Sequence, residues 1–428
     1  MFVSTRHVAF SLIFCWLLTW IYTTEMVQFW GYMGLTGEFS PTAFALSTLS
    51  TIILALFVPA TRDTREYLIT CLNYIFFLPS IVFIFYSNTN TMHLAGFLIA
   101  VVGVYFVSAI RSPVYALKPL PPVQILALVF TLILLSIIVQ AAFGGLNHFN
   151  LNIERVYEFR RVAASELPPI FGYVYSNVSS VLVPIALALS IKFRNNYLIV
   201  LTIVCAVVLF GMTHHKSVLF APFVVALLYV FFQRMNSPRI LGWVFIAIPI
   251  ACLLEIFIMR QIIHSPDPAY LNSLIIRRVL LIPSVLDGLY TDLFSRIPKY
   301  YWSTSRIGEW LVENPHGVTA PFLVGEEFFG DTDTSANAGM IGSGYSNAGL
   351  IGVAIYAALI GLLISVLNAY GRRIGHAFVT AASLSTLFNV VTSTDLVTAL
   401  LTHGLLLLLL LLALFPHATA APAESTSR

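Results

Sequence analysis

The chain of 428 residues is 58% hydrophobic and only 10% charged, with a mean hydropathy of +0.88. Soluble globular proteins are about 45–50% apolar and about 25% charged, so this composition indicates a chain that lies largely in lipid and excludes a soluble enzyme or a small secreted scaffold. The net charge of +3, from 22 Lys and Arg against 19 Asp and Glu, leaves no basic surface for nucleic acid.

Apolar runs of helical length recur along the whole chain. A membrane-spanning helix needs roughly 20 mostly apolar residues, within a range of about 17–25. Runs near that length lie at residues 8–23, 41–60, 67–86, 93–110, 124–143, 171–191, 197–211, 217–233, 240–259, 347–369, 376–393 and 397–415. No small-residue cleavage site follows the first run, so we expect an uncleaved helix there rather than a signal peptide. The predicted fold class is all-α, a polytopic membrane protein with about twelve transmembrane helices.

The positions of Lys and Arg predict the orientation of these helices. If both termini are cytoplasmic, the inner segments carry cations such as Arg62 and Arg65, whereas the short outer loops 24–40, 87–92 and 394–396 carry none. The predicted organisation is then nine helices in residues 1–259 with an external loop at 144–170, a large periplasmic loop at 260–345 with amphipathic helices, three helices in 346–415, and a cytoplasmic tail at 416–428.

Ten cations depart from this pattern because they lie in the external loops or at an outer helix end. They are Arg155, Arg160, Arg161, Lys216, Arg260, Arg277, Arg278, Arg296, Lys299 and Arg306. Long loops cross the membrane largely regardless of charge, so these side chains either are simply solvated or form a surface that faces an anion. Arg277 and Arg278 lie in an amphipathic run, residues 273–295, that Pro283 interrupts. Guanidinium groups match phosphate oxygens bidentately, but they also reach toward lipid headgroups, and both interpretations stay open.

The segment 313–330 contains the candidate acid–base residues His316, Glu326 and Glu327. Histidine is the commonest general base because its pKa is near neutrality, and a carboxylate in a dry site can also serve. A single loop histidine is otherwise an exposed side chain without a role. Four aromatic residues precede this segment and have amphipathic faces suited to sugars or to the membrane interface: Tyr300, Tyr301, Trp302 and Trp310.

Two further features lie close to or within the predicted spans. Small residues recur in GMIGSGYSNAGLIGVAIYAALIG (339–361), which favours close helix packing in lipid or a close approach of the backbone to a ligand. Glu255 is the one carboxylate deep in a predicted span, where such groups are functional candidates. The four cysteines all lie in apolar runs, which favours neither disulfides nor a metal site.

Several of these segments, in this order, resemble the Wzy-type O-antigen and oligosaccharide repeat-unit polymerases of Gram-negative inner membranes, which belong with the GT-C glycosyltransferases. The resemblance rests on the cation-rich loop after the fifth helix, a Lys-Ser pair that opens an inward-running helix, and the segments PFLVGEEFFG and GMIGSGYSNAGLIG. The family's pattern of an arginine, ten residues and a glycine occurs three times, as Arg161 with Gly172, Arg277 with Gly288, and Arg306 with Gly317. The related O-antigen ligases carry a longer histidine signature that this chain does not show clearly.

The resemblance implies a glycosyltransferase at the periplasmic face of the inner membrane that joins oligosaccharide repeat units carried on undecaprenyl pyrophosphate. It implies no metal and no cofactor; membrane lipids are partners, and a chain-length regulator is left open as another. Cations expected at the pyrophosphate are Arg277, Arg278, Arg160, Arg161, Lys216 and Arg306. The base would be His316, Glu327 or Glu326, with Tyr300, Tyr301 and Trp302 on the sugar. An O-antigen ligase, and a transporter or flippase of lipid-linked sugars, are the alternatives.

Overall fold

The chain folds into two compact helical units that are built from discontinuous segments. The computed structural model describes residues 5–87, 89–113, 117–147, 149–151, 170–234, 239–305 and 308–416, and within these ranges it contains helices and loops but no strand. Unit 1 comprises residues 1–110, 237–365 and 388–396, and unit 2 comprises residues 111–236, 366–387 and 397–428. Residues 260–345, expected to form a separate external loop, therefore belong to the same compact body as the first helices. The all-α prediction is confirmed over the described residues.

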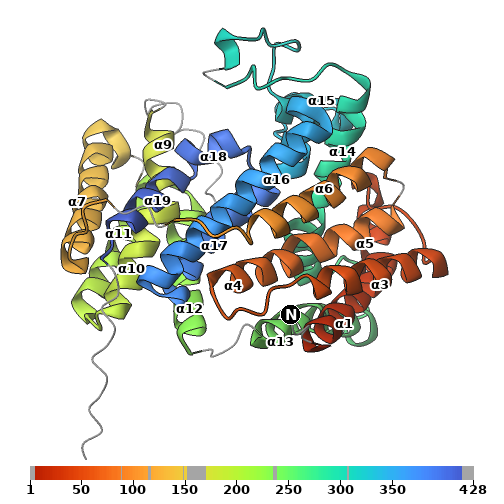
Figure 1. Ribbon diagram of the computed structural model, residues 1–428, viewed down its shortest axis with the longest axis horizontal. Helices are drawn as coiled ribbons and strands as arrows, with labels where there is room; N and C mark the ends of the chain where they lie inside the picture. The colour runs from red at the N-terminus through yellow and green to blue at the C-terminus, as the bar shows by residue number, and fades with distance from the viewer. Residues whose placement is uncertain are drawn as a thin grey trace, which may run out of the picture. The chain divides into compact units, whose positions relative to one another are not determined.

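Unit 1 surrounds one deeply buried helix, α5. Because α5 is apolar on all sides, it is buried on all sides, and it contacts α1, α3 and α14 (Figure 1). The elements of this unit are α1 (Thr5–Ile21), η1 (Tyr22–Met26), α2 (Val27–Trp30), η2 (Gly31–Met33), α3 (Pro41–Leu56), α4 (Thr64–Leu72), η3 (Asn73–Phe77), α5 (Leu78–Tyr86), α6 (Thr91–Val107), α13 (Arg239–Phe257), η6 (Ile258–Ile262), η7 (Asn272–Leu281), α14 (Ile282–Arg296), η8 (Gly308–Trp310), α15 (Ala320–Phe329) and most of α16 (Met340–Ile374).

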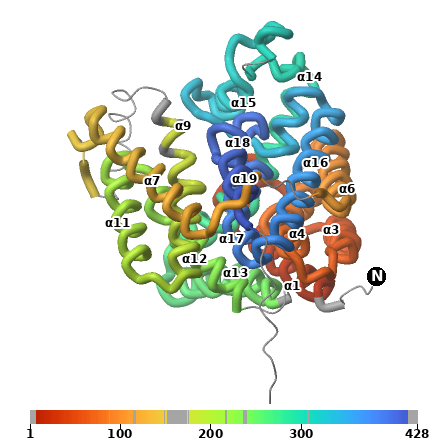
Figure 2. The backbone as a smooth tube through the Cα atoms, turned by 60° about the vertical axis from the view of Figure 1, so that its left-hand side comes forward, coloured from red at the N-terminus to blue at the C-terminus, as the bar shows by residue number. Residues whose placement is uncertain are grey.

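Unit 2 is arranged in the same way around α10. Residues 183–190 of α10 are all buried, and the helix contacts α7, α11 and α12. Helix α11 in turn contacts α7 and α12, which lie beside it in Figure 2. The elements of this unit are α7 (Pro122–Gln140), η4 (Ala141–Gly145), α9 (Ile170–Asn177), η5 (Val178–Leu182), α10 (Val183–Lys192), α11 (Asn196–Thr213), α12 (Lys216–Arg234), most of α17 (His376–Thr392), α18 (Leu396–Thr402) and α19 (Leu405–Leu414).

Wide helical turns precede a proline at three places in the chain. The π-helices η3, η5 and η7 each run directly into an α-helix whose second residue is Pro79, Pro184 or Pro283. Proline cannot donate to the preceding turn and its ring clashes with the carbonyl four residues back, so the turn before it widens instead of breaking. The interruption expected at Pro283 is therefore a change of helix type, and η7 and α14 form one continuous helix.

α14 lies in the interior of unit 1, although the sequence predicted an amphipathic helix in the large external loop. The helix packs between α5, α6 and α15 (Figure 1). Its buried side chains include Ser284, Asp287 and Thr291, which share one face at helical spacing. Apolar periodicity cannot distinguish an amphipathic helix with an exposed polar face from one whose polar face is also covered by neighbouring helices, which is why the expectation differs from the structure.

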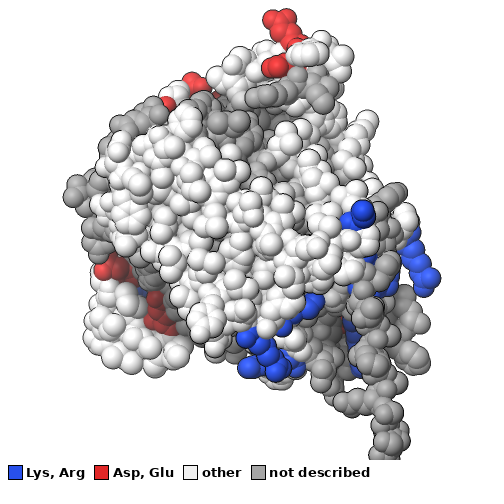
Figure 3. Space-filling model, turned by 90° about the vertical axis from the view of Figure 1, so that its left-hand side faces the viewer, with Lys and Arg blue, Asp and Glu red and all other residues white. Residues whose placement is uncertain are grey.

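Each of the twelve apolar runs falls on a helix, and these helices indicate a membrane-embedded protein. Six described helices are long and apolar enough to cross a membrane, and a seventh span results if α18 and α19, bent by 59°, are counted together. The remaining runs lie on apolar helices of 10–17 residues. Figure 3 shows a broad face without charged side chains, as contact with lipid requires. Whether all twelve helices span the membrane stays a prediction.

Candidate functional site

The chain that leaves α14 is held in an unusual conformation by the first turns of α16. The amide of Tyr300 donates to the carbonyl of Ser346 and the amide of Tyr301 to that of Asn347, both at 2.9 Å. The amide of Trp302 donates to the side-chain Oδ1 of Asn347 at 2.9 Å. Tyr301 and Trp302 have φ values of 47° and 60°, in the left-handed region that bulky residues rarely adopt. Such strain persists only where surrounding contacts impose it, and it concentrates at functional sites.

His316 lies against this segment with its ring orientation fixed. Its Nε2 is 2.9 Å from the carbonyl oxygen of Pro298, and its ring packs edge-on against Phe294 and Tyr300. Because a carbonyl oxygen only accepts hydrogen bonds, Nε2 carries the hydrogen and Nδ1 of the neutral ring is the proton acceptor. The side chain is half-buried. The arrangement thus presents one basic nitrogen whose tautomer is set by a backbone contact.

The three aromatic residues next to His316 have different roles. Tyr300 is 1% exposed and donates from its hydroxyl to the carbonyl of Val318, so it supports His316 and offers no ring face to a sugar, contrary to the role expected from the sequence. Tyr301 is 56% exposed. Trp302 donates through Nε1 to the hydroxyl of Tyr356 at 3.1 Å, and that hydroxyl donates to the carboxylate of Asp395 at 2.5 Å. Tyr301 and Trp302 therefore remain the candidates for sugar contact.

Lys299 provides a positive charge on the segment that follows α14. Its Nζ donates to the carbonyl of Phe294 and lies 5.3 Å from the ring centroid of Tyr345. Partial burial lowers the pKa of this ammonium. It is adjacent in sequence to Pro298, which His316 contacts. The sequence identified Lys299 only as one of the cations outside the positive-inside pattern.

The backbone of α16 breaks opposite Lys299. Ala348 and Gly349 leave the helical region, and Gly349 has φ 62° and ψ −147°, a conformation essentially restricted to glycine. A Cβ on Gly349 would lie 3.5 Å from Cε of Lys299. On either side of the break, Gly344 and Gly352 approach so closely that a Cβ on either would clash with the backbone of the other. The glycine-rich motif therefore packs closely, as expected, and also breaks the helix, while a close approach of its backbone to a ligand stays a prediction.

Arg277 and Arg278 form a second positive site on η7. Arg277 donates from Nη2 to Oγ of Ser273 at 2.9 Å and lies 5.3 Å from the ring centroid of Trp30. Partial burial, and then the charge of Arg278, lower the pKa of the Arg277 guanidinium. Neither arginine is paired with a carboxylate from the described part of the chain. The two like charges repel each other, which an anion between them would relieve.

The arginine pair and His316 lie at opposite ends of α14. Arg277 precedes this helix, whereas His316 contacts Phe294 in its last turn. At a rise of 1.5 Å per residue the 15 residues of α14 extend about 22 Å. The two groups therefore do not reach the same reacting atoms in this structure, although the sequence placed them in one site.

The remaining predicted site residues lie apart from both groups or outside the described residues. Glu326 and Glu327 are exposed on α15. Arg160, Arg161 and Arg306 fall outside the described ranges, as does the side chain of Lys216, which begins α12.

Two ionisable side chains noted in the sequence, Glu255 and Arg260, have structural contacts. Glu255 accepts hydrogen bonds from the amides of Leu271 and Asn272, with Oε2 2.9 Å and 3.3 Å from the two nitrogens. Glu255 therefore caps the N-terminus of η7, where backbone N–H groups otherwise lack hydrogen-bond partners. Arg260 forms an ion pair with Glu25 at 3.0 Å.

Sequence reasoning missed the residues that hold the site together, namely Asn347, Tyr345, Tyr356 and Asp395. One signal was available for Asp395, which is the only charged residue between Arg373 and the C-terminal tail and lies at the end of an apolar helix. Among the described residues no three His, Cys, Asp or Glu side chains cluster as metal ligands would.

Comparison with known proteins gives no further identification. No protein-family model, curated protein or solved structure matches this chain. The function must therefore be argued from the site itself.

Proposed function

We propose that this chain is a membrane glycosyltransferase that joins oligosaccharide repeat units carried on undecaprenyl pyrophosphate, and that residues 298–302 and His316 form its transfer centre. The observation that carries the proposal is the fixed tautomer of His316, which leaves Nδ1 as a base and holds the ring against the segment that also carries Lys299 and the strained aromatic pair Tyr301 and Trp302. The apolar helices that surround this segment in sequence suit a substrate with a lipid tail.

The proposed reaction moves a growing saccharide from its lipid pyrophosphate to a hydroxyl of the next repeat unit. Nδ1 of His316 accepts the proton of that hydroxyl, whose oxygen forms a bond to the anomeric carbon of the donor. The bond between this carbon and the pyrophosphate breaks, and the pyrophosphate leaves with the electron pair. Lys299 stabilises the charge that develops on it, an electrostatic contribution that fixed cations provide well in a partly dry site.

Arg277 and Arg278 fit the pyrophosphate of the other substrate. Both substrates of such a polymerase carry a lipid pyrophosphate, but only the donor's is at the reacting carbon. The acceptor's pyrophosphate is at the other end of its repeat unit, several sugars from the hydroxyl that reacts. A separation by the length of α14 suits this arrangement. Arg160, Arg161, Lys216 and Arg306 remain predicted contributors to either site.

The test is a purified protein in detergent or proteoliposomes, incubated with a lipid-linked repeat unit and analysed for longer saccharides. His316→Asn keeps a donor for Pro298 but has no base, so we expect the rate to fall by about 10²–10⁴-fold. His264→Asn, at an exposed histidine of the same 260–345 segment, is the matched control and should leave the rate unchanged. The double variant Arg277→Gln/Arg278→Gln should raise KM for the acceptor with a much smaller effect on kcat.

Three results would contradict the proposal. Unmodified protein that never lengthens the saccharide would exclude a polymerase. Full activity of His316→Asn would remove the base. A loss of kcat at constant KM in the double arginine variant would place Arg277 and Arg278 at the transfer centre and not at a separate acceptor site.

A transporter or flippase of lipid-linked sugars is the second candidate, and the broken helices favour it. Interrupted helices line the substrate site of many transporters, and here α16 breaks at Ala348 and Gly349 while α18 and α19 meet at 59°. Movement of a labelled lipid-linked sugar across proteoliposomes without any longer product would select this alternative. An O-antigen ligase would instead transfer the saccharide to a lipid A core acceptor.

A further inference from the structure

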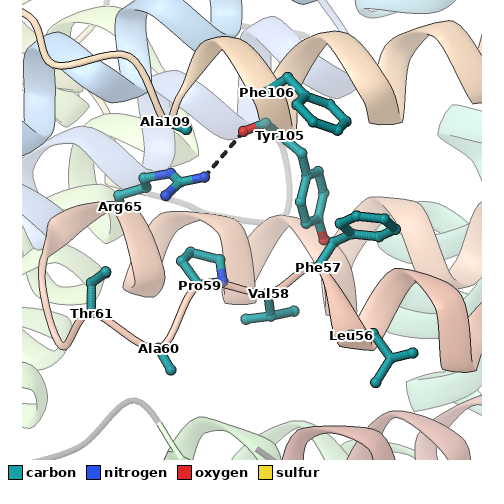
Figure 4. Close-up of a pocket in the computed structure, with 10 residues that line it drawn as sticks. All are labelled: Leu56, Phe57, Val58, Pro59, Ala60, Thr61, Arg65, Tyr105, Phe106 and Ala109. Atoms are coloured by element: carbon teal, nitrogen blue, oxygen red, sulfur yellow. Dashed lines mark hydrogen bonds between the residues drawn. The ribbon is translucent and has the colours of Figure 1, made fainter. Parts of the chain in front are cut away.

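A cavity in unit 1 combines a charged end with an apolar end. It has a volume of about 460 Å³ and is lined by the segment 56–61, by Arg65 of α4 and by residues of α6 and its end. Volumes of about 300–1,000 Å³, mostly apolar walls and a few placed polar groups are typical of small-molecule sites. Figure 4 shows the guanidinium of Arg65 at one end and the rings of Phe57 and Phe106 at the other.

The charged end is rigid. Nε of Arg65 donates to Oγ of Ser108 at 3.0 Å, and Nη2 donates to the carbonyl of Tyr105 at 3.1 Å (Figure 4). Tyr105 is itself 4% exposed and its hydroxyl donates to Asn73. A guanidinium that is already oriented loses little side-chain entropy when it binds a phosphate.

The apolar end is open and aromatic. Phe57 and Phe106 are 47% and 62% exposed, and their ring centroids are 6.3 Å apart. The segment 57–61 connects α3 with the candidate span that begins at Thr64. Because both neighbours are apolar helices, we expect this connection at the boundary between hydrocarbon and headgroups. Exposed rings at that depth face lipid chains rather than water.

We infer that this cavity binds a phospholipid, with the phosphodiester at Arg65 and one acyl chain lying along the paired rings of Phe57 and Phe106. Basic pockets between transmembrane helices at the cytoplasmic side are known to hold lipid headgroups. The predicted orientation places Arg62 and Arg65 on that side, opposite the proposed transfer centre, so the site is distinct from it. The inference does not depend on the glycosyltransferase proposal.

The test uses the full-length protein in detergent with a phosphatidylglycerol that carries a diazirine in its acyl chain. Photolabelling should concentrate on residues 56–61 and 105–109, and excess phosphatidylglycerol should compete with it. Ala109→Trp fills the cavity, so we expect labelling of these peptides to fall at least about tenfold, equivalent to about 1.4 kcal/mol of binding free energy. Leu98→Trp, at an exposed position of helix α6, which precedes Ala109, lies outside the cavity; it is the matched control and should not change the labelling.

Two competitors show whether the cavity recognises the headgroup alone or the whole lipid. Glycerophosphoglycerol has the headgroup alone and should compete weakly, whereas the intact lipid should compete fully. Labelling spread evenly over the lipid-facing helices and unaffected by Ala109→Trp would overturn the proposal, because it would indicate ordinary boundary lipid. Equal competition by glycerophosphoglycerol would also overturn it, because the site would then bind a free phosphate compound and no acyl chain. Thermal unfolding of both tryptophan variants shows whether each is folded.

Discussion

Asp287 is a carboxyl group in the interior of unit 1, 1% exposed. Its Oδ1 accepts from the amide of Gly342 at 2.8 Å, which joins α14 to the first turn of α16, while its Oδ2 has no hydrogen-bond partner among the described residues. Burial raises the pKa of Asp287 well above its ordinary value. The side chain is therefore held as a neutral acid. It positions the first turns of α16, to which the backbone of residues 300–302 is hydrogen-bonded.

The pKa of Asp287 makes stability depend on pH in a defined direction. Because the folded protein retains a proton that the unfolded chain releases above about pH 3.9, the stabilising contribution is lost as the pH rises through the folded-state pKa. Asp287→Asn stays neutral and keeps the acceptor for Gly342. We expect its melting temperature to exceed that of the unsubstituted protein at alkaline pH, by the equivalent of about 1–3 kcal/mol, and the difference to vanish toward acid pH. Parallel pH profiles of thermal unfolding would contradict this.

At the scale of elements, the broken helix α16 determines where the candidate site lies. Its first turns bind residues 300–302, and its break lies against Lys299. The two halves fit only because Gly344 and Gly352 have no side chains. The site is thus assembled between α16 and the segment 298–302 that follows α14.

Gly344→Ala tests this assembly. The added Cβ would lie 2.9 Å from the carbonyl of Gly352, and we expect a loss of about 1–3 kcal/mol of stability from overpacking, measured as a lower thermal midpoint in detergent. Gly31→Ala is the control, since nothing lies within 4 Å of its Cβ. If both variants unfold at the same temperature as the unsubstituted protein, the two halves of α16 do not approach each other as closely as described.

The elements were predictable from sequence to different extents. The apolar runs located the helices because lipid-soluble segments need only length and hydropathy to be recognised. The interior position of α14 was not predictable, since it depends on which helices cover Asp287 and Ser284. The same holds for the site: His316 was identified, but its tautomer depends on Pro298, and the strain at Trp302 depends on Asn347, 45 residues away in sequence. The separation of Arg277 from His316 was not predictable either, because it depends on how α14 runs between them, and residue spacing alone does not show this.

At the scale of the whole molecule, the predicted membrane orientation remains to be measured, and the chain is well suited to the measurement. Its four cysteines, Cys15, Cys71, Cys205 and Cys252, are all buried. Added thiols should therefore be the only ones that react with a membrane-impermeant maleimide.

Trp310→Cys and Tyr197→Cys form the informative pair, because Trp310 and Tyr197 are 87% and 89% exposed. We expect the thiol at 310 to be labelled from the periplasmic side in intact cells and the thiol at 197 only after the inner membrane is opened. The unsubstituted protein should show no labelling in either condition. Labelling of both variants from the same side would reject the orientation derived from Lys and Arg.

The carboxylate of Glu255 connects α13 to the start of η7. It therefore couples the apolar helix α13 mechanically to the helix that carries Arg277 and Arg278. A long apolar helix tilts when the bilayer is thinner than its hydrophobic length. Any change in the tilt of α13 is then passed through Glu255 to the height of Arg277 and Arg278 above the hydrocarbon. If Arg277 and Arg278 bind a lipid-anchored anion as proposed, their affinity for it will depend on acyl-chain length in the surrounding membrane.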